Sequence, residues 1–190
     1  MIYTSRYSNP ELKSGEYTPV RISLGAPRWR IGYTIAGAIK ELMPSGLRSI
    51  SDVNEFCRLY YQKLDSVGVD LIGEQLKYYE SFGKPVVLLC FEDIRKGGDN
   101  WCHRIAFAKW WKSRAGTLIP ELKDDSDFIT EGLPVVLPDV EIPKIRIVLT
   151  KDSVSRIYKD QDGRETEISF EDARKLLIAN KAKIKDIEIK

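Results

Sequence analysis

The run PVVLLCF at residues 85–91 decides the fold, because it is apolar at almost every position. It follows a segment with helical spacing of apolar residues and precedes a polar loop. A strand covered on both faces has a nearly continuous apolar run of this kind, whereas a half-exposed strand alternates apolar with polar residues. Residues 85–91 therefore predict the central strand of a mostly parallel sheet in an α/β protein.

The segments around this strand complete the pattern of an α/β domain. Residues 1–5 and 20–24 are short runs typical of strands. One helix is predicted from the N-cap Ser51-Asp52 to Gly68, and a second over residues 70–81. A third helix is predicted at about residues 102–113, after the central strand. We expect these elements to form one α/β domain over residues 1–116.

The remainder of the chain has a different character. Residues 117–144 are rich in proline and acidic residues, and we expect a linker or a covering loop there. Residues 145–190 predict a small appendage: two strands, a turn at 160–163, a third strand, a helix from Ser169 and a last strand over 184–189. So small a β-hairpin, helix and strand unit buries little surface alone. We expect it to dock on the main domain or on a second copy of itself, which would give a homo-oligomer.

The composition is that of a soluble globular protein, with 43% hydrophobic and 31% charged residues. No apolar stretch approaches the roughly 20 residues that span a bilayer, so we expect no membrane partner. The start MIYTSRYSNP lacks a signal-peptide pattern, which predicts a cytoplasmic location. Residues 1–116 carry 17 Lys and Arg against 12 Asp and Glu, while residues 117–190 carry 13 against 16. This mildly basic first part is compatible with an anionic ligand, but a dedicated nucleic-acid binder carries far more charge.

The cysteines and the histidine restrict the chemistry. Cys57, Cys90 and Cys102 form no C-x-x-C pair, and His103 is the sole histidine. The cysteine pattern therefore argues against a disulfide scaffold and a four-ligand zinc site, and the single histidine excludes every mechanism that needs two histidines. Cys57 stands beside Phe56 in a predicted amphipathic helix, where a core position is expected.

Five residues with reactive side chains meet at one predicted sheet edge. Cys90 and Glu92 leave the central strand on the same face, and Cys102, His103 and Arg104 open the next helix. The helix start and the neighbouring arginine would lower the pKa of the Cys102 thiol. His103 could carry a proton, Glu92 could orient the imidazole or act as general base, and Arg104 could hold a phosphate or carboxylate.

Each of these residues also has a purely structural explanation. Cys90 at the end of an apolar strand could simply be a small buried hydrophobe. Glu92 could cap a turn, and His103 and Arg104 could lie on the surface. The coincidence of the sole histidine, a cysteine and an arginine at one predicted helix start favours a functional site.

The sequence VVLLCFE leading into WCHR resembles the signature of the domain-of-unknown-function 488 family. The runs YTSRYSN at residues 3–9 and APRW at residues 26–29 are similar to two further features of that family, and the resemblance covers about residues 1–115. It implies a Rossmann-like three-layer α/β sandwich. It implies no reaction, because the activity of the family is unestablished. Arg6-Tyr7 stand where the family has Gly-His, so a catalytic role of that histidine would be missing here.

An enzyme acting on a nucleotide, a modified base or another anionic metabolite is the first functional hypothesis. Cys102, Glu92, His103 and Cys90 would carry out covalent or acid–base chemistry. The anion would be held by Arg104, Arg28 and Arg6, and a base could stack on Trp29 or Trp101. No cofactor is identified.

Three alternatives remain open. A nucleic-acid-binding module would contact phosphates through Arg28, Arg30, Arg95 and Lys96. A thiol redox device would join Cys90 and Cys102 in a reversible disulfide. A single metal held by Cys90, Cys102, His103 and Glu92 is the least favoured, and we assign no metal ligand, because the adjacent side chains at 102 and 103 are expected to point in different directions.

Overall fold

The computed structural model describes residues 1–97, 100–126, 136–140, 144–149, 154–160, 163–178 and 182–189. The chain divides into two compact units. The first comprises Met1–Lys112 and Gly116–Asp139, and the second comprises Val140–Lys190 together with Ser113–Ala115. Each unit contains its own four-stranded sheet.

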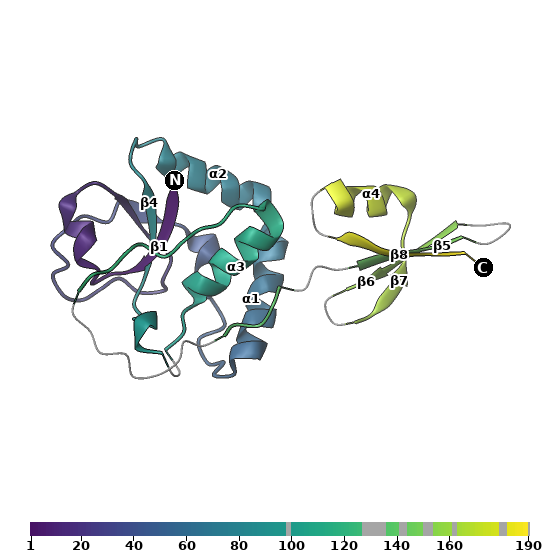
Figure 1. Ribbon diagram of the computed structural model, residues 1–190, viewed down its shortest axis with the longest axis horizontal. Helices are drawn as coiled ribbons and strands as arrows, with labels where there is room; N and C mark the ends of the chain where they lie inside the picture. The colour runs from purple at the N-terminus through teal and green to yellow at the C-terminus, as the bar shows by residue number, and fades with distance from the viewer. Residues whose placement is uncertain are drawn as a thin grey trace. The chain divides into compact units, whose positions relative to one another are not determined.

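The sheet of the first unit is entirely parallel. Its strands are β1 (Ile2–Arg6), β2 (Thr18–Arg21), β3 (Gly37–Ala38) and β4 (Val86–Cys90), in the order β1-β4-β2-β3. The central position of β4, between β1 and β2, confirms the prediction from the apolar run (Figure 1). All five residues of β4 are at most 2% exposed, as a doubly covered strand requires. The edge strand β3 has only two residues and was not predicted.

Three α-helices accompany this sheet at nearly the predicted positions. They are α1 (Val53–Val67), α2 (Val69–Glu80) and α3 (His103–Ala115). The side chain of Asp52 caps α1 by accepting a hydrogen bond of 2.7 Å from the Glu55 amide. Gly68 separates α1 from α2 with a φ of 91°, a value that side-chain-bearing residues avoid. Short 3-10 helices at Pro10–Ser14 (η1), Lys40–Leu42 (η2) and Ile94–Lys96 (η3) complete the unit.

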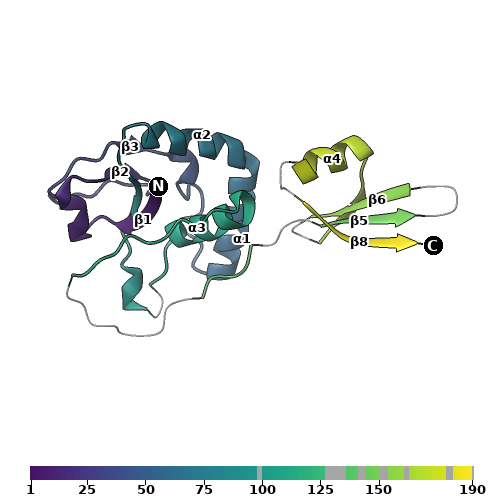
Figure 2. The same cartoon turned by 45° about the horizontal axis from the view of Figure 1, so that its top comes forward.

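The two faces of the parallel sheet are covered differently. Figures 1 and 2 show α1, α2 and α3 on one side of the β1–β4 pair and η1 on the other. The cluster on the η1 side consists of Tyr7, Leu12, Val87, Leu89 and Leu122. The α/β layering is therefore confirmed, with a layer of 3-10 helix and irregular chain in place of a second set of α-helices. Since side chains alternate along a strand, Cys90 points to the face opposite Leu89, where the α-helices lie.

The first part of the expected linker lies along β1. The Thr4 amide donates to Pro120 O at 2.9 Å, and the Leu122 amide donates to Thr4 O at 2.8 Å. Thr4 and Glu121 form a parallel bridge. In residues 117–126 the chain thus covers the sheet edge, while residues 127–135 and 141–143 of the expected linker lie outside the described residues.

The second unit has the predicted order of hairpin, helix and strand. It contains β5 (Lys144–Leu149), β6 (Val154–Lys159), β7 (Glu165–Glu167), α4 (Phe170–Ile178) and β8 (Lys183–Ile189), with sheet order β7-β6-β5-β8. Only β5 and β8 pair in parallel. Its core joins sheet and helix residues: Ile145, Ala173 and Ala182, with Ile147, Tyr158, Ile168, Leu176 and Leu177 packed against them. The predicted turn at 160–163 includes residues 161–162, outside the described part. Among the described residues, no helix is long and apolar enough to cross a membrane.

Candidate functional site

The predicted reactive residues lie at the carboxyl edge of the parallel sheet. Cys90 is the last residue of β4 and stands opposite Arg6, the last residue of β1. Cys102 is the N-cap of α3, and His103 is the first residue of that helix. A strand end and a helix start therefore meet where ligands commonly bind in open α/β sheets.

Four of these side chains contact one another. Glu92 Oε2 lies 2.9 Å from Cys90 Sγ and 2.8 Å from Cys102 Sγ. His103 Nδ1 lies 3.5 Å from Cys90 Sγ and 3.7 Å from Cys102 Sγ. Both thiols are 2% exposed and the imidazole is 6% exposed, whereas Glu92 is exposed. We call these four residues the thiol–carboxylate cluster; it has one face open to solvent, at Glu92.

The expectation that adjacent Cys102 and His103 point in different directions is wrong. Cys102 has extended backbone angles, with φ at −146° and ψ at 143°, and only His103 has entered the helix. Two residues on opposite sides of this change in backbone conformation need not follow the roughly 100° rotation that separates neighbours within a helix. Their side chains consequently converge on the same point beside Cys90.

The second nitrogen of His103 determines how the ring can act. His103 Nε2 lies 3.1 Å from the carbonyl oxygen of Ile22, at the end of β2. A carbonyl oxygen only accepts hydrogen bonds, so Nε2 carries a proton. In the neutral ring the lone pair then belongs to Nδ1, the atom that faces the two sulfurs.

The cluster divides its protons unequally. The pKa of the Cys90 thiol is raised, chiefly by the hydrogen bond between Cys90 and Cys102 and then by burial. Burial alone would also raise the pKa of the Cys102 thiol, but its hydrogen bonds with Cys90 and His103 and the positive charge of Arg104 hold that pKa well below its usual value. Burial and the neighbouring charge of Cys102 raise the pKa of the Glu92 carboxyl. Cys102 is therefore the thiolate of the pair, and Glu92 binds a proton more readily than an ordinary glutamate.

Arg104 supports the cluster from within the protein. The residue is 0% exposed. Its Nη1 donates to Glu92 O at 2.8 Å, its Nη2 donates to Glu121 Oε1 at 2.8 Å, and its Nε donates to both carboxylate oxygens of Glu121 at 3.2 Å. All three guanidinium nitrogens thus have partners inside the chain, and the binding of an external anion by Arg104 stays a prediction.

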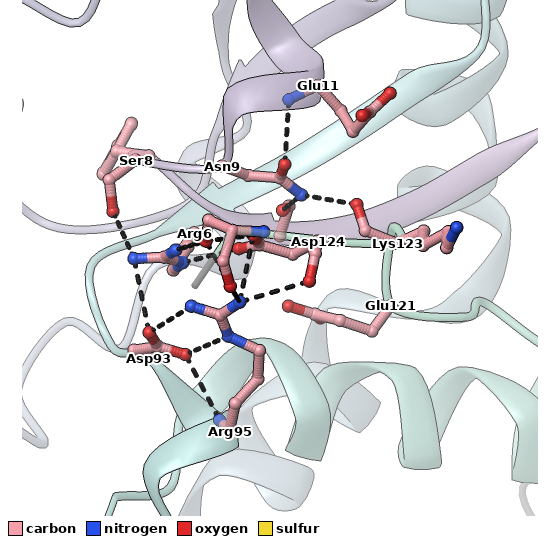
Figure 3. A network of polar contacts seen from close by, with 12 residues as sticks. Arg6, Ser8, Asn9, Glu11, Asp93, Arg95, Glu121, Lys123 and Asp124 are labelled. Atoms are coloured by element: carbon pink, nitrogen blue, oxygen red, sulfur yellow. Dashed lines mark hydrogen bonds and ion pairs between the residues drawn. The ribbon is translucent and has the colours of Figure 1, made fainter. Parts of the chain in front are cut away.

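Arg6 and Arg95 are also engaged with acidic residues of the chain (Figure 3). Arg6 lies 2.7 Å from Asp124 and 3.3 Å from Asp93, while Arg95 lies 2.7 Å from Asp93 and 3.0 Å from Asp124. These arginines connect the end of β1, the turn after β4 and the chain at 121–126, and the binding of an anionic ligand by Arg6 stays a prediction. The arrangement holds the turn that follows Glu92.

Sequence reasoning missed the two acidic partners in the covering segment. Glu121 and Asp124 lie in the stretch whose composition predicts a linker or covering loop. The signal that could have found them is the basic surplus of residues 1–116, since buried arginines need carboxylates from elsewhere in the chain. The Ile22 carbonyl that orients His103 has no sequence signal, because every residue carries one.

The remaining predicted ligand residues lie on the loop after β2. Arg28 is exposed, and Trp29 is 51% exposed with its ring centroid 5.8 Å from that of Phe91. Phe91 stands in sequence between Cys90 and Glu92, so the Trp29 loop contacts the segment that carries the cluster. Trp101 instead packs edge-on against Phe56 of α1, with a centroid distance of 4.8 Å.

The first unit is thus an α/β domain with two thiols, an imidazole and a carboxylate gathered at the carboxyl edge of its parallel sheet. Comparison of the chain with protein-family models, with curated proteins and with solved structures found no match in any of the three. The resemblance to the domain-of-unknown-function 488 family stays a prediction.

Proposed function

We propose that the protein is an enzyme that acts on a nucleotide, a modified base or another anionic metabolite at the thiol–carboxylate cluster. The observation that carries the proposal is the contact of Glu92 Oε2 with both sulfurs, 2.9 and 2.8 Å away. Burying two thiols and an imidazole around a carboxylate gives little stability in return, whereas such perturbed groups are common in active sites.

Glu92 is the acid–base group of this proposal. It is the exposed member of the cluster, so it is the one that a substrate can reach. Its raised pKa brings the carboxyl nearer to neutral pH, where proton transfer is most effective. Arg28 and Trp29 are the exposed residues of the β2 loop that suit an anion and an aromatic ring.

A thermal-shift screen of nucleotides, nucleobases and phosphorylated metabolites tests the proposal. A ligand at 100 times its Kd stabilises the folded chain by about 2.7 kcal/mol, which is readily measured. We expect at least one ligand class to raise the Tm of the wild type, and Trp29→Ala to reduce that shift. Tyr78→Ala is the matched control, because Tyr78 is an exposed aromatic residue on α2, outside the cluster. A wild type that responds to no ligand would overturn the proposal.

A thiol redox function is the second candidate, and one distance favours it. Cys90 Sγ and Cys102 Sγ lie within 4.8 Å of each other, and both residues are free cysteines. Hydrogen peroxide would take two electrons and two protons from the pair, forming one S–S bond while its O–O bond breaks to give two water molecules. Mass spectrometry should then detect the loss of two hydrogens in the wild type and in Cys57→Ser, but not in Cys102→Ser. An unchanged wild-type mass would exclude this function.

A nucleic-acid-binding module is the weaker alternative. Of the four cations considered for it, Arg28, Arg30 and Lys96 are exposed, while Arg95 is paired with Asp93 and Asp124. Binding through phosphates would weaken steeply with added salt. A gel-shift titration at two salt concentrations measures this, and the absence of any shift at low salt would remove the alternative.

Two further predictions concern the state of the protein in the cell. The free cysteines suit a reducing compartment such as the cytoplasm. A homo-oligomer through the second unit is the other prediction, since a unit of this size buries little surface by itself. Sedimentation analysis of the full chain at several concentrations decides whether it self-associates.

A further inference from the structure

Three atoms of the cluster have the lone pairs that a metal ion needs. Cys90 Sγ, Cys102 Sγ and His103 Nδ1 all lie within 4.8 Å of one another, and all three residues are buried. They come from two elements held in place by the fold, the end of β4 and the start of α3. A preformed group of thiols and imidazole of this kind is uncommon without a ligand, because its polar atoms are removed from water.

The two distances from His103 Nδ1 to the sulfurs match edges of a coordination tetrahedron. With zinc bonds of about 2.3 Å to sulfur and 2.0–2.1 Å to nitrogen, a tetrahedral ion separates the two ligand atoms by about 3.6 Å. The distances from Nδ1 to the two sulfurs are 3.5 and 3.7 Å. An ion can therefore bind between the three atoms with little movement of the side chains.

The orientation of His103 is the independent observation. Its Nε2–H donates a hydrogen bond to Ile22 O at 3.1 Å, which leaves the Nδ1 lone pair directed at the sulfurs. In the same way, a metal-binding histidine almost always uses its other ring N–H to donate a hydrogen bond to a backbone carbonyl, a carboxylate or water. Arg104 is not a ligand, but it stabilises the site, because its hydrogen bond to Glu92 O holds the chain that joins β4 to α3.

We propose that the protein binds one zinc ion through Cys90 Sγ, Cys102 Sγ and His103 Nδ1, with the fourth position open beside Glu92. Two thiolates and one imidazole are ligands that favour zinc over magnesium or calcium. Both sulfurs bind as thiolates, so any proton that a thiol still carries is released to solvent, and the two thiolates neutralise the charge of the ion. Three protein ligands with one open position are typical of catalytic rather than structural zinc.

Glu92 is not the fourth zinc ligand in this proposal; it acts on the molecule that occupies the open position. Its Oε2 lies 2.8–2.9 Å from the sulfurs, closer than two ligands of one tetrahedral ion stand. A water molecule in the fourth position would be activated by the ion, and the Glu92 carboxylate could accept its proton. The catalytic role of the zinc rests on the proposed function. Zinc binding itself is tested without any substrate.

Zinc competition against a chromogenic chelator, with the reduced and metal-free full chain, measures the binding. We expect one zinc per chain for the wild type. Cys90→Ser, Cys102→Ser and His103→Asn should each weaken binding by more than about 100-fold, beyond the 10–100-fold that loss of an outer partner costs. Cys57→Ser is the matched control, because Cys57 is buried in α1 and should keep full affinity. Glu92→Gln should also keep the zinc affinity of the wild type. A Glu92→Gln variant that no longer binds zinc would overturn the three-ligand assignment.

X-ray absorption of the zinc-loaded wild type needs no variant, and so avoids variants that fail to fold. It should show two sulfurs at about 2.3 Å and lighter ligands at about 2.0–2.1 Å. A wild type that binds no stoichiometric zinc, or a zinc shell without sulfur, would overturn the inference. A ligand-induced Tm shift in metal-free protein would then still support the proposed function. Zinc binding without a response to any ligand would leave the inference standing and remove the function.

Discussion

At the scale of single residues, Arg104 and Glu121 explain how a charged group can lie inside this domain. Arg104 is completely buried, and Glu121 supplies two carboxylate oxygens to its Nε and Nη2. Thr4 adds a hydrogen bond of 2.6 Å to the same carboxylate. A buried guanidinium without such a partner costs several kcal/mol, so the pair is needed for folding whatever the cluster does.

Glu121→Ala tests the importance of this pair. We expect the free energy of unfolding to fall by about 3 kcal/mol, because the charge of Arg104 would stay buried and keep only one of its hydrogen-bond acceptors described above, the Glu92 carbonyl. Urea denaturation measures the change as a lower midpoint at constant slope. Glu16→Ala, at an exposed position, should stay within about 0.5 kcal/mol of the wild type. Equal stability of the two variants would contradict the assignment.

At the scale of elements, the network in Figure 3 connects β1, η3 and the chain at 121–126. Asp124 is its best-buried acid, with a side chain that is 7% exposed. Burial alone would raise the pKa of Asp124, but the hydrogen bonds from Arg6 and Ser126 lower it below its usual value. Because the turn that carries Glu92 is part of this network, its integrity affects the cluster as well as stability.

The pH dependence of stability tests the network through Asp124→Asn. A carboxyl with a lowered folded pKa contributes stability above its unfolded pKa of about 3.9, and loses it as the pH falls through the folded value. We expect the variant to be less stable than the wild type by about 2 kcal/mol at pH 7, the range for hydrogen bonds to charged groups. The two stability curves should converge as the pH falls below the unfolded pKa and through the lowered folded pKa of Asp124.

Asp125→Asn is the matched control for this prediction. Asp125 is the neighbouring acid, and its pair with Lys123 is exposed on both sides, at 64% and 79%. Exposed pairs of this kind contribute 0 to about 1 kcal/mol. A control that changes the pH profile as much as Asp124→Asn would show that nonspecific charge, rather than the network, is responsible.

At the scale of the whole molecule, the two units have separate sheets and separate cores. The cluster lies entirely in the first unit. Residues 1–139 therefore contain every strand and helix that holds Cys90, Cys102 and His103 in place.

A fragment of residues 1–139 should accordingly fold without the second unit. We expect a single cooperative unfolding transition and retention of the zinc affinity of the full chain. Circular dichroism during urea denaturation and the chelator competition measure these two properties. If the oligomer forms through the second unit, the fragment should also sediment as a monomer at concentrations where the full chain associates. A fragment that is unfolded in buffer would contradict the division into units.

The sequence by itself determined the local elements of this protein. The apolar run at 85–91 is found as the central strand, and the Asp52 cap and Gly68 begin and end α1. The sequence also placed Cys90 and Cys102 at one predicted sheet edge, since ligand sites in open parallel sheets gather at the carboxyl ends of the strands, but it left open whether the two thiols meet. These features depend on spacing and backbone preference over a few residues, which are written directly in the chain.

Only the tertiary structure decided which groups pair within the site. His103 finds its partner 81 residues away at Ile22, and Arg6 finds Asp124 118 residues away. Arg104 pairs with Glu121, and the convergence of Cys102 with His103 depends on one extended residue before the helix. A side chain pairs with whatever charge or carbonyl the packed chain brings within hydrogen-bond distance. That choice depends on how distant segments cover the sheet, which local spacing does not specify.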